Sequence, residues 1–369
     1  MAHRSAPKRI AVIGPGTDDP RTMLGCYAFP NHVVGASDDL GLPIPTILTA
    51  IREEFAGEEF EGSEVVHARG CDIESEDTSG LAGAAALAAS NDVAFVVVGD
   101  LAGLFGRGTS GEGCDRADLT LPGMQAALVR DILATGTPAV LVVVSGRPYA
   151  LGEFAEDTAA IVQSFFPGVN GAAALAGVLS GRLNPSGRLP MGVPRDPGGQ
   201  PATYRAAPLG RHTPGVTTLD PTPLFAFGHG LSYTSVDYLG IETSTDEMDV
   251  TGTVEVTITA RNTGDRACIG VVQLYASDLL AQVARPVIEL IGFVAVPLDP
   301  GQQRSLAFEV HADRLSFTGL DGTRIVEPGT VRFSTGTSAG DLPHQANVEV
   351  TGQTREVHGP RIMDTPALA

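Results

Sequence analysis

One carboxylate in a glycine-rich loop is the strongest candidate for chemistry in this sequence. Glu112 lies between Gly111 and Gly113 in the segment Arg107–Arg116, which reads RGTSGEGCDR. Glycines on both sides let the backbone approach a ligand closely and let the acid move. A mobile carboxylic acid is suited to proton donation. The alternative is a solvated loop acid with no chemical role, and composition alone favours that alternative.

The segments around this loop place it at the edge of a sheet. Val93–Val98 is continuously apolar and predicts a buried strand, and Leu121–Gln125 has the features of a helix start. In open α/β sheets, ligands bind outside the carboxyl ends of the strands. Glu112 is therefore expected where a substrate could reach it.

The first half of the chain, residues 1–205, is expected to be an α/β sandwich domain. Short segments rich in Val and Ile predict strands at Arg9–Ile13, Glu64–Ala68, Val93–Val98, Ala139–Val144 and Ala160–Phe165. Helical patterns fall between them at Pro45–Phe55, Leu81–Ala89, Met124–Ala134 and Ala172–Leu179. Continuously apolar strands that alternate with helices predict a mostly parallel sheet covered on both faces, with too few units for an eight-stranded barrel.

The pattern changes in the second half of the chain. Residues 206–234 are rich in Pro and Gly and predict a long irregular connection. From about residue 235 to 352 the apolar residues alternate with period two between turn signals, which predicts an antiparallel β-sandwich of the immunoglobulin or fibronectin type III kind. Residues 353–369 show no periodicity and are expected to form a tail.

Composition excludes several classes of function. The chain has 43 acidic and 24 basic residues and a net charge of −19, which disfavours nucleic acid and anionic membrane surfaces as partners. No segment of about 18 or more apolar residues is present, and we expect a soluble cytoplasmic protein. The four cysteines have no zinc-like spacing, so reduced thiols are expected, with pairing of Cys71 and Cys114 as the alternative.

Four other motifs have a structural explanation beside a functional one. Ile13–Thr17 follows the first strand as a phosphate loop would, but it lacks the required spacing, and Pro15 removes a backbone donor. Ser145 lacks the flanking glycine pattern of a nucleophile elbow and is expected to be a turn residue. His229 is expected to be a packing residue, and Asp100 either caps a loop or acts on a substrate.

Taken together, several strings resemble glycoside hydrolase family 3, the β-glucosidases, β-xylosidases and related exo-acting enzymes. They occur in the family's order and correspond to its carboxyl-terminal half: Lys8–Pro15, Ala68–Asp72, Gly111–Arg116, Leu119–Gln125, Phe165–Gly168, Leu183–Pro190 and Phe227–Tyr233. Arg285–Phe293 resembles the family's fibronectin type III domain.

The resemblance implies a retaining mechanism on a β-linked glycoside. One carboxylate attacks the anomeric carbon, and another protonates the leaving oxygen and then activates water. The position that matches the family's general acid/base is Glu112, and proximity in the loop suggests Leu104, Phe105 and Arg107 as substrate-binding residues. No cofactor or metal is implied.

The sequence departs from the family in one large respect. The family's (β/α)8 barrel, which carries the aspartate nucleophile, has no counterpart here, and the chain has no Trp for the string that usually contains that aspartate. Three hypotheses follow. The chain is one subunit of a split glycosidase whose barrel subunit supplies the nucleophile; it is a non-hydrolytic carbohydrate-binding or scaffolding protein; or it is a nucleotide- or phosphate-binding protein. A homo-oligomer is also possible if the barrel-facing surface lacks its partner.

Overall fold

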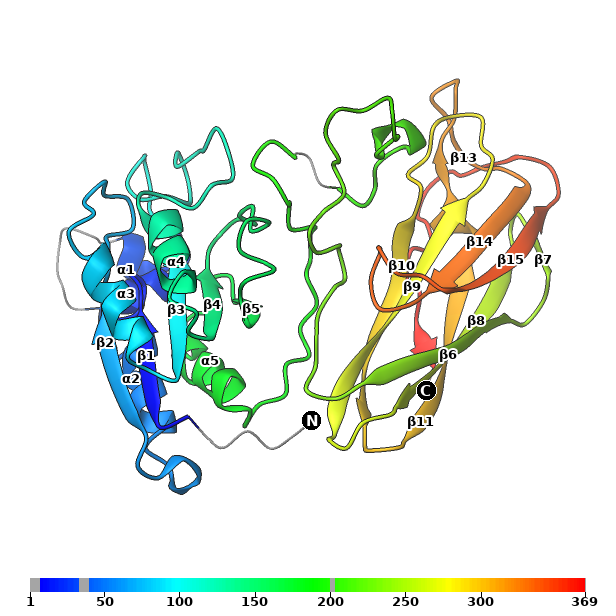
Figure 1. Cartoon of the computed structure of the whole chain (residues 1–369). Coiled ribbons are helices and arrows are strands. Elements are labelled where there is room, and N and C mark those ends of the chain that lie inside the picture. Colours follow the sequence, from blue (N-terminus) through cyan, green and yellow to red (C-terminus); the bar gives the residue numbers. More distant parts are fainter. Residues whose placement is uncertain (1–6, 33–39, 200–202, 369) are drawn as a thin grey trace. The chain divides into compact units, whose positions relative to one another are not determined.

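The chain folds into two compact units. The computed structural model describes residues 7–32, 40–199 and 203–368 (Figure 1). Unit 1 comprises Met1–Leu183 with Pro194–Gly198, and unit 2 comprises Asn184–Val193 with Gly199–Ala369. The sandwich domain was expected to run to residue 205. The continuous part of unit 1 ends earlier, at Leu183.

Unit 1 contains a five-stranded parallel sheet in the order β2-β1-β3-β4-β5. Its strands are β1 (Arg9–Ile13), β2 (Glu64–Ala68), β3 (Val93–Gly99), β4 (Ala139–Val144) and β5 (Ala160–Gln163). Its helices are α1 (Phe29–His32), α2 (Ile47–Glu54), α3 (Leu81–Ala89), α4 (Gln125–Leu133) and α5 (Gly171–Ser180), with 3-10 turns at Pro20–Met23 and Glu58–Phe60. The expected α/β fold with a parallel sheet is confirmed.

The apolar strands are buried because helices cover the sheet. Along β3, Phe95 and Val97 point into a core that also contains Ile47 and Ile51 of α2 and Leu175 of α5. Side chains alternate across a strand, so the intervening residues of β3 point to the opposite face, which α3 and α4 cover. Two covered faces explain why these strands are apolar throughout.

The strand order creates a topological switch point between β1 and β3. The chain leaves β1 toward β2 on one side of it and leaves β3 toward β4 on the other. The crevice between such diverging connections is where open α/β sheets bind ligands. The carboxyl ends of the strands face the upper edge in Figure 1, where the loop after β3 lies.

Unit 2 is an antiparallel β-sandwich with a common core. One sheet has the order β10-β9-β14-β15-β7 and the other has the order β17-β11-β8-β6, while β12-β13-β16 form a small third sheet. The strands are β6 (Val236–Thr243), β7 (Glu247–Asp249), β8 (Thr253–Asn262), β9 (Cys268–Asp278), β10 (Glu289–Leu298), β11 (Gln303–His311), β12 (Phe317–Thr318), β13 (Arg324–Val326), β14 (Gly329–Thr335), β15 (His344–Thr351), β16 (Arg355–Glu356) and β17 (Ala367–Leu368), with 3-10 turns at Pro208–Gly210 and Ala312–Leu315. The predicted alternation holds along β8, where Val254, Val256 and Ile258 are buried.

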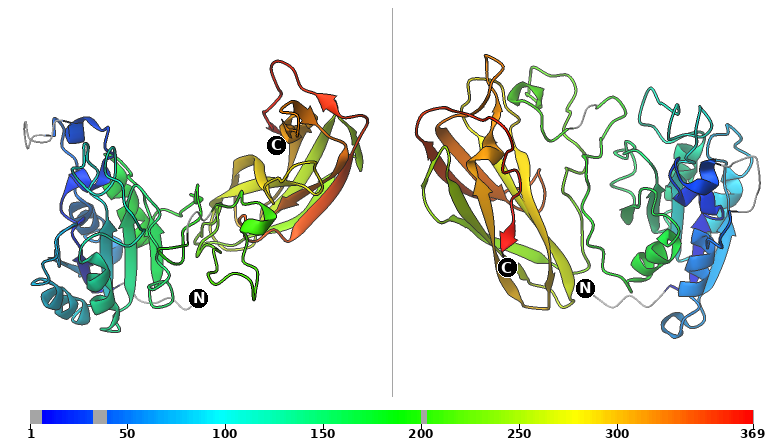
Figure 2. Two further views of the ribbon diagram at one scale, coloured as in Figure 1. Left: turned by 90° about the horizontal axis from the view of Figure 1, so that it is seen from above. Right: turned by 180° about the vertical axis from the view of Figure 1, so that it is seen from behind.

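The segment after residue 352 is not a free tail, contrary to expectation. Strand β16 pairs with β13, and β17 pairs with β11. The backbone N–H of Ile362 donates to Asp313 Oδ2 at 3.0 Å. Figure 2 shows this red segment running along the sandwich. Strands of two residues are too short to produce a periodic pattern, so the sequence gives no sign of them.

Within the parts of the chain that the structure describes, no helix has both the length and the apolar character needed to cross a membrane.

Candidate active site

The Glu112 loop is held in shape by hydrogen bonds between its two sides. The Gly103 N–H donates to Ser110 O at 2.9 Å, and the Thr109 N–H donates to Leu101 O at 2.9 Å. A short parallel bridge joins Ala102 to Ser110. The base of the loop therefore continues from strand β3 as ordered backbone.

Gly111 is required by the close approach of two segments. Its φ is +124°, and a Cβ atom there would lie 2.2 Å from Gly103 O and 2.6 Å from the Cys26 Cβ atom. Gly113 has a φ of +71°, in the left-handed region. The glycines that suggested a mobile acid thus also let the chain pack tightly and turn at Glu112.

Asp100, directly after β3, is buried and accepts hydrogen bonds from two neighbouring loops. Its side chain is 2% exposed, and Oδ1 accepts hydrogen bonds from the Thr109 hydroxyl at 2.7 Å and from the Tyr149 hydroxyl. Oδ2 accepts from the Gly146 N–H at 2.9 Å. Burial, and then the charge of Asp100, raises the pKa of Tyr149, so this hydroxyl remains a donor. These contacts favour loop support over direct contact with a substrate.

Arg147 holds the loop on both sides of Glu112. Its Nη2 donates to Thr109 O at 2.9 Å and to Cys114 O at 2.8 Å. The two carbonyl groups precede and follow the acid in the sequence, so one guanidinium group closes the base of the loop. Sequence reasoning treated Ser145–Pro148 only as a turn and missed this role. The signal was an arginine three positions after the end of a buried strand, β4, which is next to the strand that feeds the loop.

Glu112 itself is exposed at the switch point. Its Oε2 accepts a hydrogen bond of 2.7 Å from the Tyr27 hydroxyl. Tyr27 is 68% exposed and lies on the connection after β1, whereas Glu112 lies on the connection after β3. The hydrogen bond to Glu112 raises the pKa of Tyr27. The carboxylate is thus oriented by a donor and remains open to solvent, as an acid that meets an external substrate must be.

The three suggested substrate-binding residues have different surroundings. Phe105 is 80% exposed and has a φ of +55°, which is strained for a phenylalanine and presents its ring to solvent. The Arg107 side chain is also exposed. Leu104 is only 9% exposed and offers little surface to a ligand. Phe105 and Arg107 are therefore the more accessible of the three.

The remaining sequence candidates have structural roles in these surroundings. A Cβ atom at Gly14 would lie 2.0 Å from Val97 O, so the Ile13–Thr17 loop needs its glycine for packing. The Ser145 hydroxyl is buried and donates to Arg147 O at 2.7 Å. All four cysteines are free thiols, so Cys71 and Cys114 are not joined in this structure.

No group of three or more histidine, cysteine or acidic side chains in the described ranges is arranged to hold a metal ion.

Comparison with known proteins identifies the family of this chain. Residues 4–233 match the glycosyl hydrolase family 3 C-terminal domain, and residues 270–339 match a fibronectin type III-like domain. The chain belongs to glycosyl hydrolase family 3. The resemblance of the individual strings to this family is therefore confirmed, as is the restriction to its carboxyl-terminal half.

The family relatives are β-xylosidases and β-glucosidases. A β-xylosidase of Formosa agariphila is 34% identical over 334 residues, which cover 90% of this chain and 44% of the relative. A periplasmic β-glucosidase of Salmonella typhimurium is 30% identical over 349 residues, which cover 87% of this chain and 43% of the relative. The chain thus spans less than half the length of these curated relatives.

Solved structures of family members share the fold of this chain. A β-glucosidase involved in saponin metabolism from intestinal bacteria has a TM-score of 0.83 at 30% identity, over 94% of this chain and 51% of that one. The β-glucosidase of Listeria innocua in complex with glucose has a TM-score of 0.80 at 29% identity, over 95% of this chain and 47% of that one. Each solved chain is about twice as long as the part that matches.

Proposed function

We propose that this chain supplies the general acid/base, Glu112, of a retaining exo-acting β-glycosidase of the β-glucosidase or β-xylosidase type. The nucleophile would come from an aspartate on a (β/α)8 barrel carried by a separate subunit. In such a mechanism Glu112 protonates the departing glycosidic oxygen and then takes a proton from the attacking water.

The observation that carries the proposal is the position and support of Glu112. It lies at the switch point of the sheet, exposed, with its carboxylate oriented by the Tyr27 hydroxyl at 2.7 Å and its loop closed by Arg147. A protein with only a scaffolding role has no need for such a supported, accessible acid. The family relationship adds support, because the named relatives are β-glycosidases.

The proposed mechanism requires a partner subunit. In retaining glycosidases the acid and the nucleophile are only about 5 Å apart. A barrel subunit would therefore have to bind at the edge of the sheet that carries the Glu112 loop. Without it, the acid has no nucleophile to work with, and the chain alone should hydrolyse aryl β-glycosides negligibly.

The experiment combines this chain with a (β/α)8 barrel subunit and measures hydrolysis of aryl β-glucosides and β-xylosides. We expect activity only in the mixture. Glu112→Gln in the mixture should slow hydrolysis by about 10²–10⁴-fold for poor leaving groups and much less for good ones, because only poor leaving groups depend on protonation. Glu58→Gln, which changes an exposed glutamate outside the loop, is the matched control.

Two outcomes would contradict the proposal. Equal rates for Glu112→Gln and the unmodified chain with poor leaving groups would exclude Glu112 as the acid. Failure of barrel subunits to bind or to restore hydrolysis would favour the second candidate, a non-hydrolytic carbohydrate-binding or scaffolding protein.

A further inference from the structure

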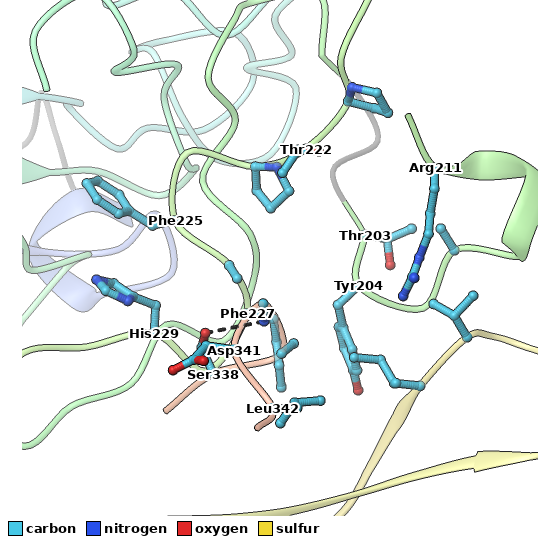
Figure 3. Close-up of a pocket in the computed structure, with 18 of the residues that line it drawn as sticks. Thr203, Tyr204, Arg211, Thr222, Phe225, Phe227, His229, Ser338, Asp341 and Leu342 are labelled. Atoms are coloured by element: carbon cyan, nitrogen blue, oxygen red, sulfur yellow. Dashed lines mark hydrogen bonds between the residues drawn. The ribbon is translucent and has the colours of Figure 1, made fainter. Parts of the chain in front are cut away.

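Unit 2 contains an open pocket that the proposed role of Glu112 does not use. Its volume is about 720 Å³, which is within the usual range of roughly 300–1,000 Å³ for small-molecule sites. The connection from Thr203 to His229 forms much of the wall, and the turns at Val287–Ile288 and Thr337–Leu342 complete it. Figure 3 shows the side chains that line it.

Aromatic rings form two stacked pairs in this pocket. Tyr204 stacks on Phe227 with ring centroids 4.1 Å apart, and Phe225 stacks on His229 with centroids 5.2 Å apart and planes within 11°. All four side chains are partly exposed. Burial, and then the charge of Arg188, lowers the pKa of His229, so its ring is neutral at physiological pH. The pocket therefore presents flat, uncharged aromatic faces.

The walls of the pocket are fixed to the sandwich by backbone hydrogen bonds. The Val287 N–H donates to Ala206 O at 3.1 Å, and the Ala339 N–H donates to Phe227 O at 2.9 Å. The Leu290 N–H donates to the Tyr204 hydroxyl at 3.4 Å. A pocket with fixed walls loses little conformational freedom when a ligand binds, which favours binding.

One positively charged and one negatively charged side chain line the pocket beside the aromatic rings, and both can form hydrogen bonds. Arg211 is exposed, extends toward Tyr204 in Figure 3, and makes no side-chain hydrogen bond or ion pair with any residue in the described ranges. Asp341 lies on the opposite wall, where its Oδ2 accepts from the Thr337 hydroxyl at 2.6 Å. The hydroxyl groups of Thr203 and Thr222 also line the pocket.

This combination selects one class of ligand. One cation opposite one carboxylate, in a chain of net charge −19, disfavours an anion such as a nucleotide. The charged and hydroxyl groups disfavour a purely apolar ligand, since binding it would strip them of water. A sugar ring has an apolar face of C–H groups and a rim of hydroxyl groups, which match aromatic faces and mixed donors and acceptors.

We propose that the pocket of unit 2 lined by Tyr204, Phe227, Arg211 and Asp341 binds a neutral oligosaccharide. Aromatic faces pack against the sugar rings, and Arg211 and Asp341 hydrogen-bond to their hydroxyl groups. All residues that line the pocket belong to unit 2, whereas the Glu112 loop belongs to unit 1. The pocket therefore binds saccharide in this chain by itself, without any catalytic partner.

Isothermal titration calorimetry of the full chain with xylotriose and with cellotriose tests this inference. We expect saturable binding of at least one of them, weakened at least about tenfold by Arg211→Ala and by Tyr204→Ala. Arg211 is exposed, so its replacement should leave the fold intact even if replacement of Tyr204 does not. Arg304→Ala, which changes an arginine of β11 outside the pocket, should leave binding unchanged.

Three results would overturn the inference. The first is no binding of either saccharide, and the second is binding that Arg211→Ala and Tyr204→Ala leave unchanged. The third is loss of binding with Tyr27→Ala but not with Arg211→Ala, which would place the saccharide at the Glu112 loop. Because no barrel subunit is present, none of these results depends on whether the chain takes part in hydrolysis.

Discussion

Replacement of Arg147 by alanine should loosen the acid loop and destabilise unit 1. The guanidinium group makes two hydrogen bonds, of 2.9 Å to Thr109 O and 2.8 Å to Cys114 O. Hydrogen bonds from a charged donor contribute about 1.5–3 kcal/mol each, or about 3–6 kcal/mol for two. Arg147 is only partly buried, so in the variant water replaces part of the hydrogen bonding that is lost. We expect the free energy of unfolding to fall by about 2–4 kcal/mol.

Urea unfolding followed by helical circular dichroism measures this loss. The α-helices in the described ranges all lie in unit 1, so the signal reports on the unit that contains Arg147. Hydrogen exchange adds a local measurement, because the amides of Gly103 and Cys114 are bonded across and within the loop. We expect both amides to exchange faster in the variant.

Arg130→Ala is the matched control. Arg130 also lies in unit 1 and pairs with Glu153 at 2.9 Å, but its side chain is 57% exposed. An exposed pair of this kind contributes less than about 1 kcal/mol. If Arg147→Ala costs no more than Arg130→Ala and leaves exchange in the loop unchanged, then Arg147 does not hold the loop.

Two further predictions concern unit 1. Glu54 accepts hydrogen bonds from Arg182, which lower its pKa below the ordinary 4.5. Its stabilising contribution is therefore present above pH 4.5 and is lost as the pH falls through the lowered value. Urea unfolding should show Glu54→Gln to be less stable than the unmodified chain at neutral pH, with the difference fading as the pH falls below 4.5; a constant difference would contradict this. Gly111→Ala should lower the thermal midpoint of the helical signal far more than Gly136→Ala. Both glycines have positive φ, but a Cβ atom would lie 2.2 Å from Gly103 O at Gly111 and would meet nothing within 4 Å at Gly136. Equal thermal midpoints for the two variants would show that the Glu112 loop accommodates the added Cβ atom without loss of stability.

The sheet of unit 1 could be predicted from the sequence because each strand carries its own signal. Val93–Val98 is apolar at every position, since both faces of β3 are covered, and the observed strand extends it by one residue. Helix α3 has the expected bounds, Leu81–Ala89. Such patterns are local, so no knowledge of the rest of the fold was required.

The site was less predictable because its contacts join distant parts of the chain. Tyr27 and Glu112 are 85 positions apart, and no local pattern at Tyr27 marks it as a donor to that acid. Asp100 is buried beneath two different loops, one of which contributes Thr109 and the other Gly146 and Tyr149 as hydrogen-bond donors. Residue types indicated chemistry at Glu112, but the fold alone determines which groups surround it.

The final strand has a practical consequence for handling the protein. Strand β17 pairs with β11 at Ala307 and Phe308, and the Glu309 N–H donates to Pro366 O at 3.0 Å. A chain cut after residue 352 would leave these backbone groups of β11 unpaired along an open edge. Unpaired edges recruit strands from other molecules. Shortened versions of this protein are therefore expected to aggregate, and affinity tags placed at the carboxyl end need a spacer that leaves β17 free to pair.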